Sequence, residues 1–175
     1  AWRPGILPTE PAEVLRPAAR LYHDLTQILR LCLPGEFDPK TAAPGLCGLL
    51  ARAADVPDVA TLDAFVEETQ AKVRRTFGQI LGHVAGANYE YCAAGKGEKS
   101  PKAENAFESL ATKAAILQAW DDSVAYCDAV FKSLTDRSAS EPITMPFSGA
   151  KGVRIATLMG DIQHLNEHYG NLVTY

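Results

Sequence analysis

The chain has 175 residues, a formal net charge of −4 and 47% hydrophobic residues, values typical of one globular domain that buries its own core. Its basic residues form no stripe, which argues against a nucleic-acid partner. No apolar run approaches the roughly 20 residues that span a bilayer. The first residues lack the apolar core and cleavage pattern of a secretory signal, so we expect no membrane association and a cytoplasmic location.

The cysteines are widely spaced and form no C-x-x-C pair: Cys32, Cys47, Cys92 and Cys127. At this chain length such spacing does not indicate a disulfide framework. Two of them, Cys32 and Cys127, fall on apolar helical rows, where a free cysteine behaves as a small hydrophobic residue. We therefore expect all four to be reduced and mostly structural.

Helical periodicity dominates the sequence, and strand signals are nearly missing. Residues 1–16 are expected to form an extended N-terminal segment. The first long helix is predicted to open at Pro17, because proline suits the first turn of a helix, and to end at Pro34-Gly35. Residues 35–75 are rich in proline and predict an irregular connection with extra helical pieces, including a short helix over residues 46–54.

The second main helix is predicted to begin at Thr76, because residues 76–79 match a capping box and an apolar row follows to about Ala94. A third main helix is predicted from Thr112 to Leu134, and a polar loop over residues 136–146. The last helix is predicted from about Val153 to the end of the chain. The residues of this helix that we expect to face inward are Ile155, Leu158, Met159, Ile162, Leu165, Tyr169, Leu172 and Val173.

Four amphipathic helices predict an all-α fold, a four-helix bundle with a long connection between the first two main helices. Residues 1–175 are expected to form a single domain. Glycines recur every four residues along the second main helix, at Gly78, Gly82 and Gly86. They are interpreted as allowing close approach of a neighbouring helix, although a slightly weak helix without special contacts would show the same pattern.

Histidines provide the main functional signal. His164 and His168 are four residues apart on the last helix, so their side chains share one face and could chelate one metal ion. His83 lies among apolar residues of the second main helix, where an unpaired imidazole is costly to bury. A lone core histidine is the simpler interpretation of His83, but the pair on another helix favours a shared site. His23 has polar neighbours and is left out.

Three histidine ligands leave a coordination position open, which is the pattern of catalytic rather than structural sites. That position could hold a water molecule or a thiol. Asp161, one turn before His164, could orient that imidazole or enter the coordination sphere, and simple solvation of its carboxylate is equally compatible with the sequence. Three imidazoles suit zinc, nickel, iron or copper, and we expect one divalent ion, with Zn, Ni or Fe favoured.

Residues 76–89, 123–135 and 164–175 resemble the DinB/YfiT-like superfamily, and residues 17–33 are loosely similar to it. The resemblance implies a four-helix bundle, often dimeric, with one histidine from the second helix and an H-x-x-x-H from the last. These positions fall on His83, His164 and His168. The family name reflects damage-inducible expression, which implies a stress response. Characterised members include transferases and an isomerase that use thiols such as mycothiol, bacillithiol or glutathione.

Three functions follow as hypotheses. The first is a metal-dependent enzyme of the thiol S-transferase type, acting on a small-molecule substrate with a low-molecular-weight thiol. The second interprets residues 164–168 as an H-x-x-E-H motif of a metal-dependent hydrolase, with Glu167 as general base. The third is a non-catalytic metal-binding stress-response protein. The first is favoured, as a homodimer.

Overall fold

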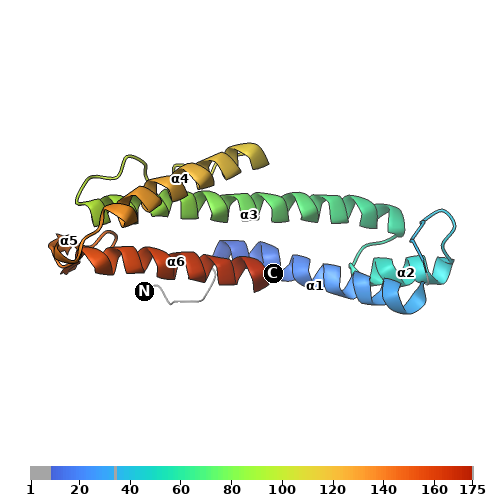
Figure 1. Cartoon of the computed structure of the whole chain (residues 1–175). Helices are drawn as coiled ribbons and strands as arrows, with labels where there is room; N and C mark the ends of the chain where they lie inside the picture. Colours follow the sequence, from blue (N-terminus) through green and yellow to red (C-terminus); the bar gives the residue numbers. More distant parts are fainter. Residues whose placement is uncertain (1–8, 34, 175) are drawn as a thin grey trace. The chain divides into compact units, whose positions relative to one another are not determined.

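The computed structural model describes residues 9–33 and 35–174 (Figure 1). Helix makes up 71% of the structure, so the predicted all-α fold is confirmed. The elements in chain order are α1 (Thr9–Cys32), α2 (Pro44–Ala53), α3 (Val59–Lys96), α4 (Lys113–Ser133), α5 (Asp136–Ala139), β1 (Pro142–Thr144), β2 (Lys151–Val153) and α6 (Arg154–Thr174). No helix within the described ranges has the length and apolar content needed to cross a membrane.

Contacts divide the chain into two compact units, with the boundary between Thr76 and Phe77. The first unit, up to Thr76, contains α1, α2 and the beginning of α3. The second unit, from Phe77 to Thr174, contains the rest of α3 and all later elements. This division neither confirms nor contradicts the single domain expected for residues 1–175, which stays a prediction.

Helix α1 begins at Thr9 and contains Pro17 in its interior, so the predicted start at Pro17 is wrong. The extended segment predicted for residues 1–16 is wrong from Thr9 onward, and its first eight residues lie outside the described part of the chain. Ala12 and Leu15 are buried and extend the row of Ala18 and Leu21 towards the N-terminus. Packing along this row outweighs the hydrogen bond that proline cannot donate.

An aliphatic cluster forms the core of the first unit. Leu21 of α1, Leu50 of α2 and Leu62 of α3 are buried together with Ala54. Helix α2 corresponds to the short helix predicted over residues 46–54 and starts slightly earlier, with Pro44 in its first turn. The predicted irregular connection is therefore largely helical, and it brings aliphatic side chains from three helices into contact.

Helix α3 runs without a break from Val59 to Lys96. The predicted helix start at Thr76 is wrong, because Thr76 lies inside this helix with 6% of its surface exposed. The residues before it, 70–75, contain no glycine or proline that would end a helix. The residue types of a capping box are also compatible with a helix interior, so the motif alone did not fix a boundary.

The second unit contains α4, α5, α6 and a small hairpin. Helix α4 matches the prediction closely, since Thr112 caps it by accepting a hydrogen bond from the Ala115 amide at 3.2 Å. The predicted polar loop over residues 136–146 contains α5 and β1, and β1 pairs antiparallel with β2, with Ile143 opposite Gly152. The turn between these strands uses positive φ angles at Phe147 and Gly149.

Helix α6 buries a mostly polar row and exposes an apolar one. Its buried residues are Thr157, Leu158, Asp161, His164 and Asn171. Its exposed apolar residues are Met159, Ile162, Tyr169 and Val173, so the prediction that these four face inward is wrong. The polar row is buried because it contacts other helices: His164 packs near His83 of α3, and Asp161 lies against Cys127 of α4.

Candidate metal centre

Two histidines of α6 face each other across one helical turn. The Nε2 atoms of His164 and His168 are 3.1 Å apart, and the ring planes are inclined at 72°. Two nitrogens bound to one tetrahedral ion at about 2.0–2.1 Å each would be separated by about 3.3 Å. The observed distance is close to this value, so the pair needs little movement to share an ion.

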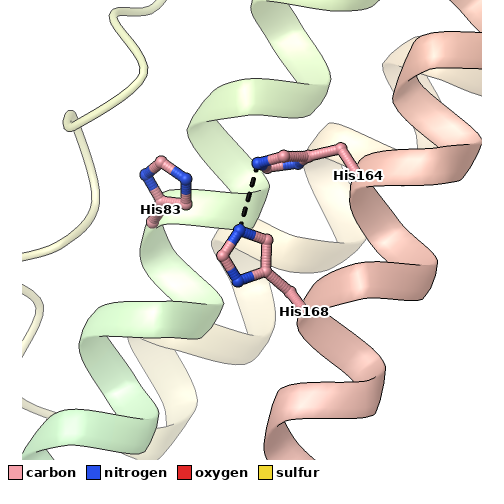
Figure 2. Close-up of side chains that lie close together, drawn as sticks. All are labelled: His83, His164 and His168. Carbon is pink, nitrogen blue, oxygen red and sulfur yellow. Dashed lines mark hydrogen bonds between the residues drawn. The ribbon is translucent and has the colours of Figure 1, made fainter. Parts of the chain in front are cut away.

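The third ring comes from α3. The His83 ring centroid lies 5.3 Å from that of His164 and 5.1 Å from that of His168. Figure 2 shows the three side chains converging from the two helices. Their ligand nitrogens all lie within 4.8 Å of one another, as a shared ion requires. The structure thus brings together all three histidines singled out in the sequence.

The pair on α6 is held in the neutral form. Burial, helped by the neighbouring imidazoles of His168 and His83, lowers the pKa of His164 to about 4. Burial and His83 likewise lower the pKa of His168 to about 4. Both rings therefore carry a lone pair at neutral pH, which is the state that binds metal. The donor set and its protonation both fit a divalent ion.

Two carboxylates flank His83. The Nδ1 atom of His83 lies 3.1 Å from Glu108 Oε1, and its Nε2 atom lies 3.7 Å from Glu104 Oε1. When Nδ1 carries the proton of the neutral ring, it donates a hydrogen bond to Glu108, and the free lone pair is then on Nε2. This is the carboxylate–histidine pairing that commonly orients a metal ligand. The sequence analysis did not identify either glutamate, since both lie in the irregular segment between α3 and α4, where no periodic pattern marks them.

Glycines on α3 allow this segment to approach His83. A Cβ atom on Gly82 would overlap the carbonyl of Phe107, and one on Gly86 would overlap the carbonyl of Glu104. The predicted close approach is present at Gly82 and Gly86, but the prediction that a helix makes it there is wrong. The neighbour at Gly82 and Gly86 is an irregular segment, whereas at Gly78 it is a helix, through Ile116 of α4.

Asp161 lies in a buried polar group of its own. Its Oδ2 atom is 3.6 Å from Cys92 Sγ and 3.7 Å from Cys127 Sγ. With the Asn88 amide oriented so that both of its ends are satisfied, its nitrogen donates to Asp161 Oδ1 at 3.2 Å. Burial raises the pKa of Asp161 to about 7. The buried Nδ1 atom of His164 has no hydrogen-bond partner among the described residues, so a role for Asp161 in orienting His164 stays a prediction.

Cys92 and Cys127 form a disulfide, so the expectation that all four cysteines are reduced is wrong for these two. They are separated by 35 residues and lie on α3 and α4. Spacing in the sequence does not reveal which turns of two packed helices meet, and this is why the pair was missed. Cys32 and Cys47 are free, as expected.

The sequence pattern of the DinB superfamily matches residues 49–172, which include all three histidines. The chain belongs to the DinB superfamily. Membership agrees with the all-α fold and with the resemblance to this family found in the sequence. The matched residues include the three histidines that the structure brings together as a candidate metal site.

A stretch of this DinB-family chain is also similar to bifunctional glutamine synthetase adenylyltransferase/adenylyl-removing enzymes. Identity is 57% over 82 residues for the enzyme of Rhodopseudomonas palustris strain BisB5, covering 47% of this chain and 8% of that enzyme. It is 57% over 81 residues for that of Bradyrhizobium diazoefficiens, covering 46% and 8%. The chain thus spans a small fraction of these relatives. No solved structure matches it.

Proposed function

We propose that this protein is a metal-dependent enzyme that binds one divalent ion through His83, His164 and His168. The convergence of three ligand nitrogens within 4.8 Å of one another carries the proposal. Two of these ligands are neutral at neutral pH, and the third has a carboxylate partner that fixes its proton. Zinc, nickel and iron are the candidate ions, because all three accept imidazole ligands.

The residues around the site have distinct roles in this proposal. Glu108 accepts a hydrogen bond from Nδ1 of His83 and so keeps the lone pair of Nε2 available to the metal ion. Glu104, 3.7 Å from that Nε2 atom, can hold a proton at the edge of the site. A bound divalent ion supplies an open coordination position at which a thiol loses its proton and becomes a nucleophile.

The specific reaction that we propose is transfer of a low-molecular-weight thiol to a small electrophile, in the cytoplasm. The thiol chemistry rests on the resemblance to DinB/YfiT-like transferases. The adenylyltransferases resemble this chain over only 8% of their own length, so their reactions are not proposed for it. A homodimer belongs to the proposal as well, and the exposed apolar residues Ile162 and Tyr169 of α6 offer a surface for it.

The experiment compares wild-type protein with the H164A/H168A variant and with H23A, whose histidine is exposed on α1. We expect elemental analysis to find one divalent ion per chain in wild type and H23A, and none in H164A/H168A. Glutathione, mycothiol or bacillithiol should then raise the melting temperature of the metal-loaded wild type only. Equal metal content in all three proteins would refute the site, whereas metal without any effect of a thiol would refute the transferase.

Two other functions remain as alternatives. A non-catalytic metal-binding stress-response protein would bind the ion but turn over no electrophile with any thiol. A hydrolase using Glu167 as general base would lose metal-dependent activity in E167Q, whereas a thiol transferase would keep it. Thiol-transferase and hydrolase assays of wild type and E167Q together therefore separate the three possibilities.

A further inference from the structure

A second cluster of metal-ligand side chains lies beside the candidate metal centre. Cys92 of α3, Cys127 of α4 and Asp161 of α6 are all buried, and their ligand atoms lie within 4.8 Å of one another. Asp161 Oδ2 is almost equidistant from the two sulfurs, at 3.6 and 3.7 Å. Three helices thus contribute one ligand each to a single point in the interior.

The Oδ1 atom of Asp161 accepts a hydrogen bond from Asn88, but the disulfide leaves its Oδ2 atom without a donor among the described residues. A disulfide has no S–H group, so neither sulfur can donate to the carboxylate oxygen between them. Within the described residues Asp161 forms no ion pair, and its surface is only 2% exposed. A carboxylate this deeply buried is costly unless hydrogen-bond donors or a cation compensate it. Two thiols, or an ion bound by two thiolates, would provide that compensation.

We propose that Cys92, Cys127 and Asp161 form a second metal site when the disulfide is reduced, and that it takes a thiophilic divalent ion such as zinc. An external dithiol breaks the S–S bond in two exchange steps. It transfers two electrons and two protons to the cysteines and leaves as its own cyclic disulfide. Binding of the ion then releases the two thiol protons, and both sulfurs act as thiolate ligands.

The donor set suits such an ion in ligand type and in charge. Thiolate and carboxylate both bind zinc, at about 2.3 Å and about 2.0–2.2 Å. Two thiolates and one carboxylate with a divalent ion carry a net charge of −1, which equals that of a Cys₃His zinc site. The sulfurs would have to separate to about 3.8 Å, so the ion and the disulfide exclude each other.

The cytoplasmic location proposed above would favour the reduced state. Glutathione and thioredoxin keep most thiols reduced in the cytosol, where stable disulfides are rare. The second site does not depend on the histidine site, since the two share no ligand. Each can be removed by its own substitutions while the other is measured.

Metal titration of the full-length H164A/H168A variant tests the proposal, because this variant lacks the histidine pair. The protein is reduced with dithiothreitol, freed of it under anaerobic conditions and titrated with Co²⁺, which reports thiolate ligands by a charge-transfer band. We expect about one Co²⁺ per chain with this band after reduction and none in the oxidised protein. The band should disappear on addition of Zn²⁺, the tighter-binding ion.

Further variants identify the ligands. C92S/C127S should abolish the band, whereas C32S/C47S, which removes the two free cysteines, should keep it. D161N should weaken binding by more than the roughly 10- to 100-fold that loss of an outer-shell partner costs. No charge-transfer band in the reduced protein would overturn the proposal. Loss of its helical circular dichroism on reduction would do so as well, since the disulfide would then be a structural cross-link.

Discussion

The two compact units bury different kinds of side chain. The core of the first is aliphatic and consists of Leu21, Leu50, Ala54 and Leu62. Buried polar residues are concentrated in the second, where they are Asn88, Ser123, Thr157, Asp161, His164 and Asn171. Buried polar groups stabilise a fold poorly, because each must recover the hydrogen bonds that it made with water. The contrast indicates that the first unit is built for packing, and the second for chemistry that needs polar groups away from solvent.

Truncation of the aliphatic core should produce the largest loss of stability. Leu50 is 1% exposed and Leu31 is 84% exposed, so the same substitution tests a buried and an exposed leucine. We expect L50A to lower the free energy of unfolding by about 2–5 kcal/mol, since it leaves a cavity. L31A should change it by less than about 0.5 kcal/mol. Urea denaturation measures both, and equal losses would contradict the packing role of the first unit.

Periodicity in the sequence predicted the helices better than their ends. The rows of apolar residues located α4 and α6 to within about one residue of their observed starts. At Pro17 and Thr76 the same kinds of signal were misleading. Tertiary packing carries α1 through a proline and α3 through a capping motif, and neither effect is visible in a local pattern.

The candidate site could be predicted only in part. His164 and His168 were identifiable because four-residue spacing on a helix places two side chains together regardless of tertiary structure. His83 could be identified only in combination with that pair, because a lone histidine in an apolar row is more simply a core residue. Glu104, Glu108 and the Cys92–Cys127 disulfide depend on which segments meet in three dimensions. No spacing rule links a residue in an irregular segment to a particular turn of a helix.

Two glycine-to-alanine substitutions, one in each unit, compare a glycine in close contact with one that has space for a side chain. In G86A the new Cβ atom would overlap the Glu104 carbonyl, whereas in G48A on α2 it would make an ordinary contact with Arg52. We expect G86A to destabilise the protein by about 1–3 kcal/mol through overpacking. G48A should instead stabilise it by up to about 1 kcal/mol, since alanine favours a helix. Thermal unfolding distinguishes the two signs.

The G86A variant should also weaken metal binding, because displacement of Glu104 shifts the segment that carries Glu108, the carboxylate partner of His83. We expect a loss of about 10- to 100-fold in affinity, with G48A unchanged. E108Q tests the role of Glu108 directly, since it removes the charge beside His83 without adding a Cβ atom to α3, and it should weaken metal binding as well. If E108Q binds metal as tightly as wild type, Glu108 does not orient His83.

The last expected effect is a pH dependence of stability, to which the buried groups of the second unit contribute through their shifted pKa values. In the metal-free protein, His164 and His168 have pKa values of about 4, below the ordinary 6.5. As the pH falls from 6.5 to 4, these histidines bind protons in the unfolded chain but not in the folded protein, so the free energy of unfolding falls. Asp161 has a pKa of about 7 in place of 3.8. As the pH rises from 3.8 to 7, Asp161 loses its proton in the unfolded chain but keeps it in the folded protein. Its contribution therefore lowers the free energy of unfolding as the pH rises, opposite to that of the histidines.

Two histidines oppose one aspartate between pH 4 and 6.5, so stability of the oxidised, metal-free wild type should rise with pH by at most about 1.4 kcal/mol per unit. D161N removes the opposing group, and its slope should be steeper. H164A/H168A leaves Asp161 alone, and its slope should reverse. Urea denaturation at several pH values measures all three slopes. Identical slopes in the three proteins would mean that these buried groups titrate as they do in the unfolded chain, and the polar interior would then not differ electrostatically from the surface.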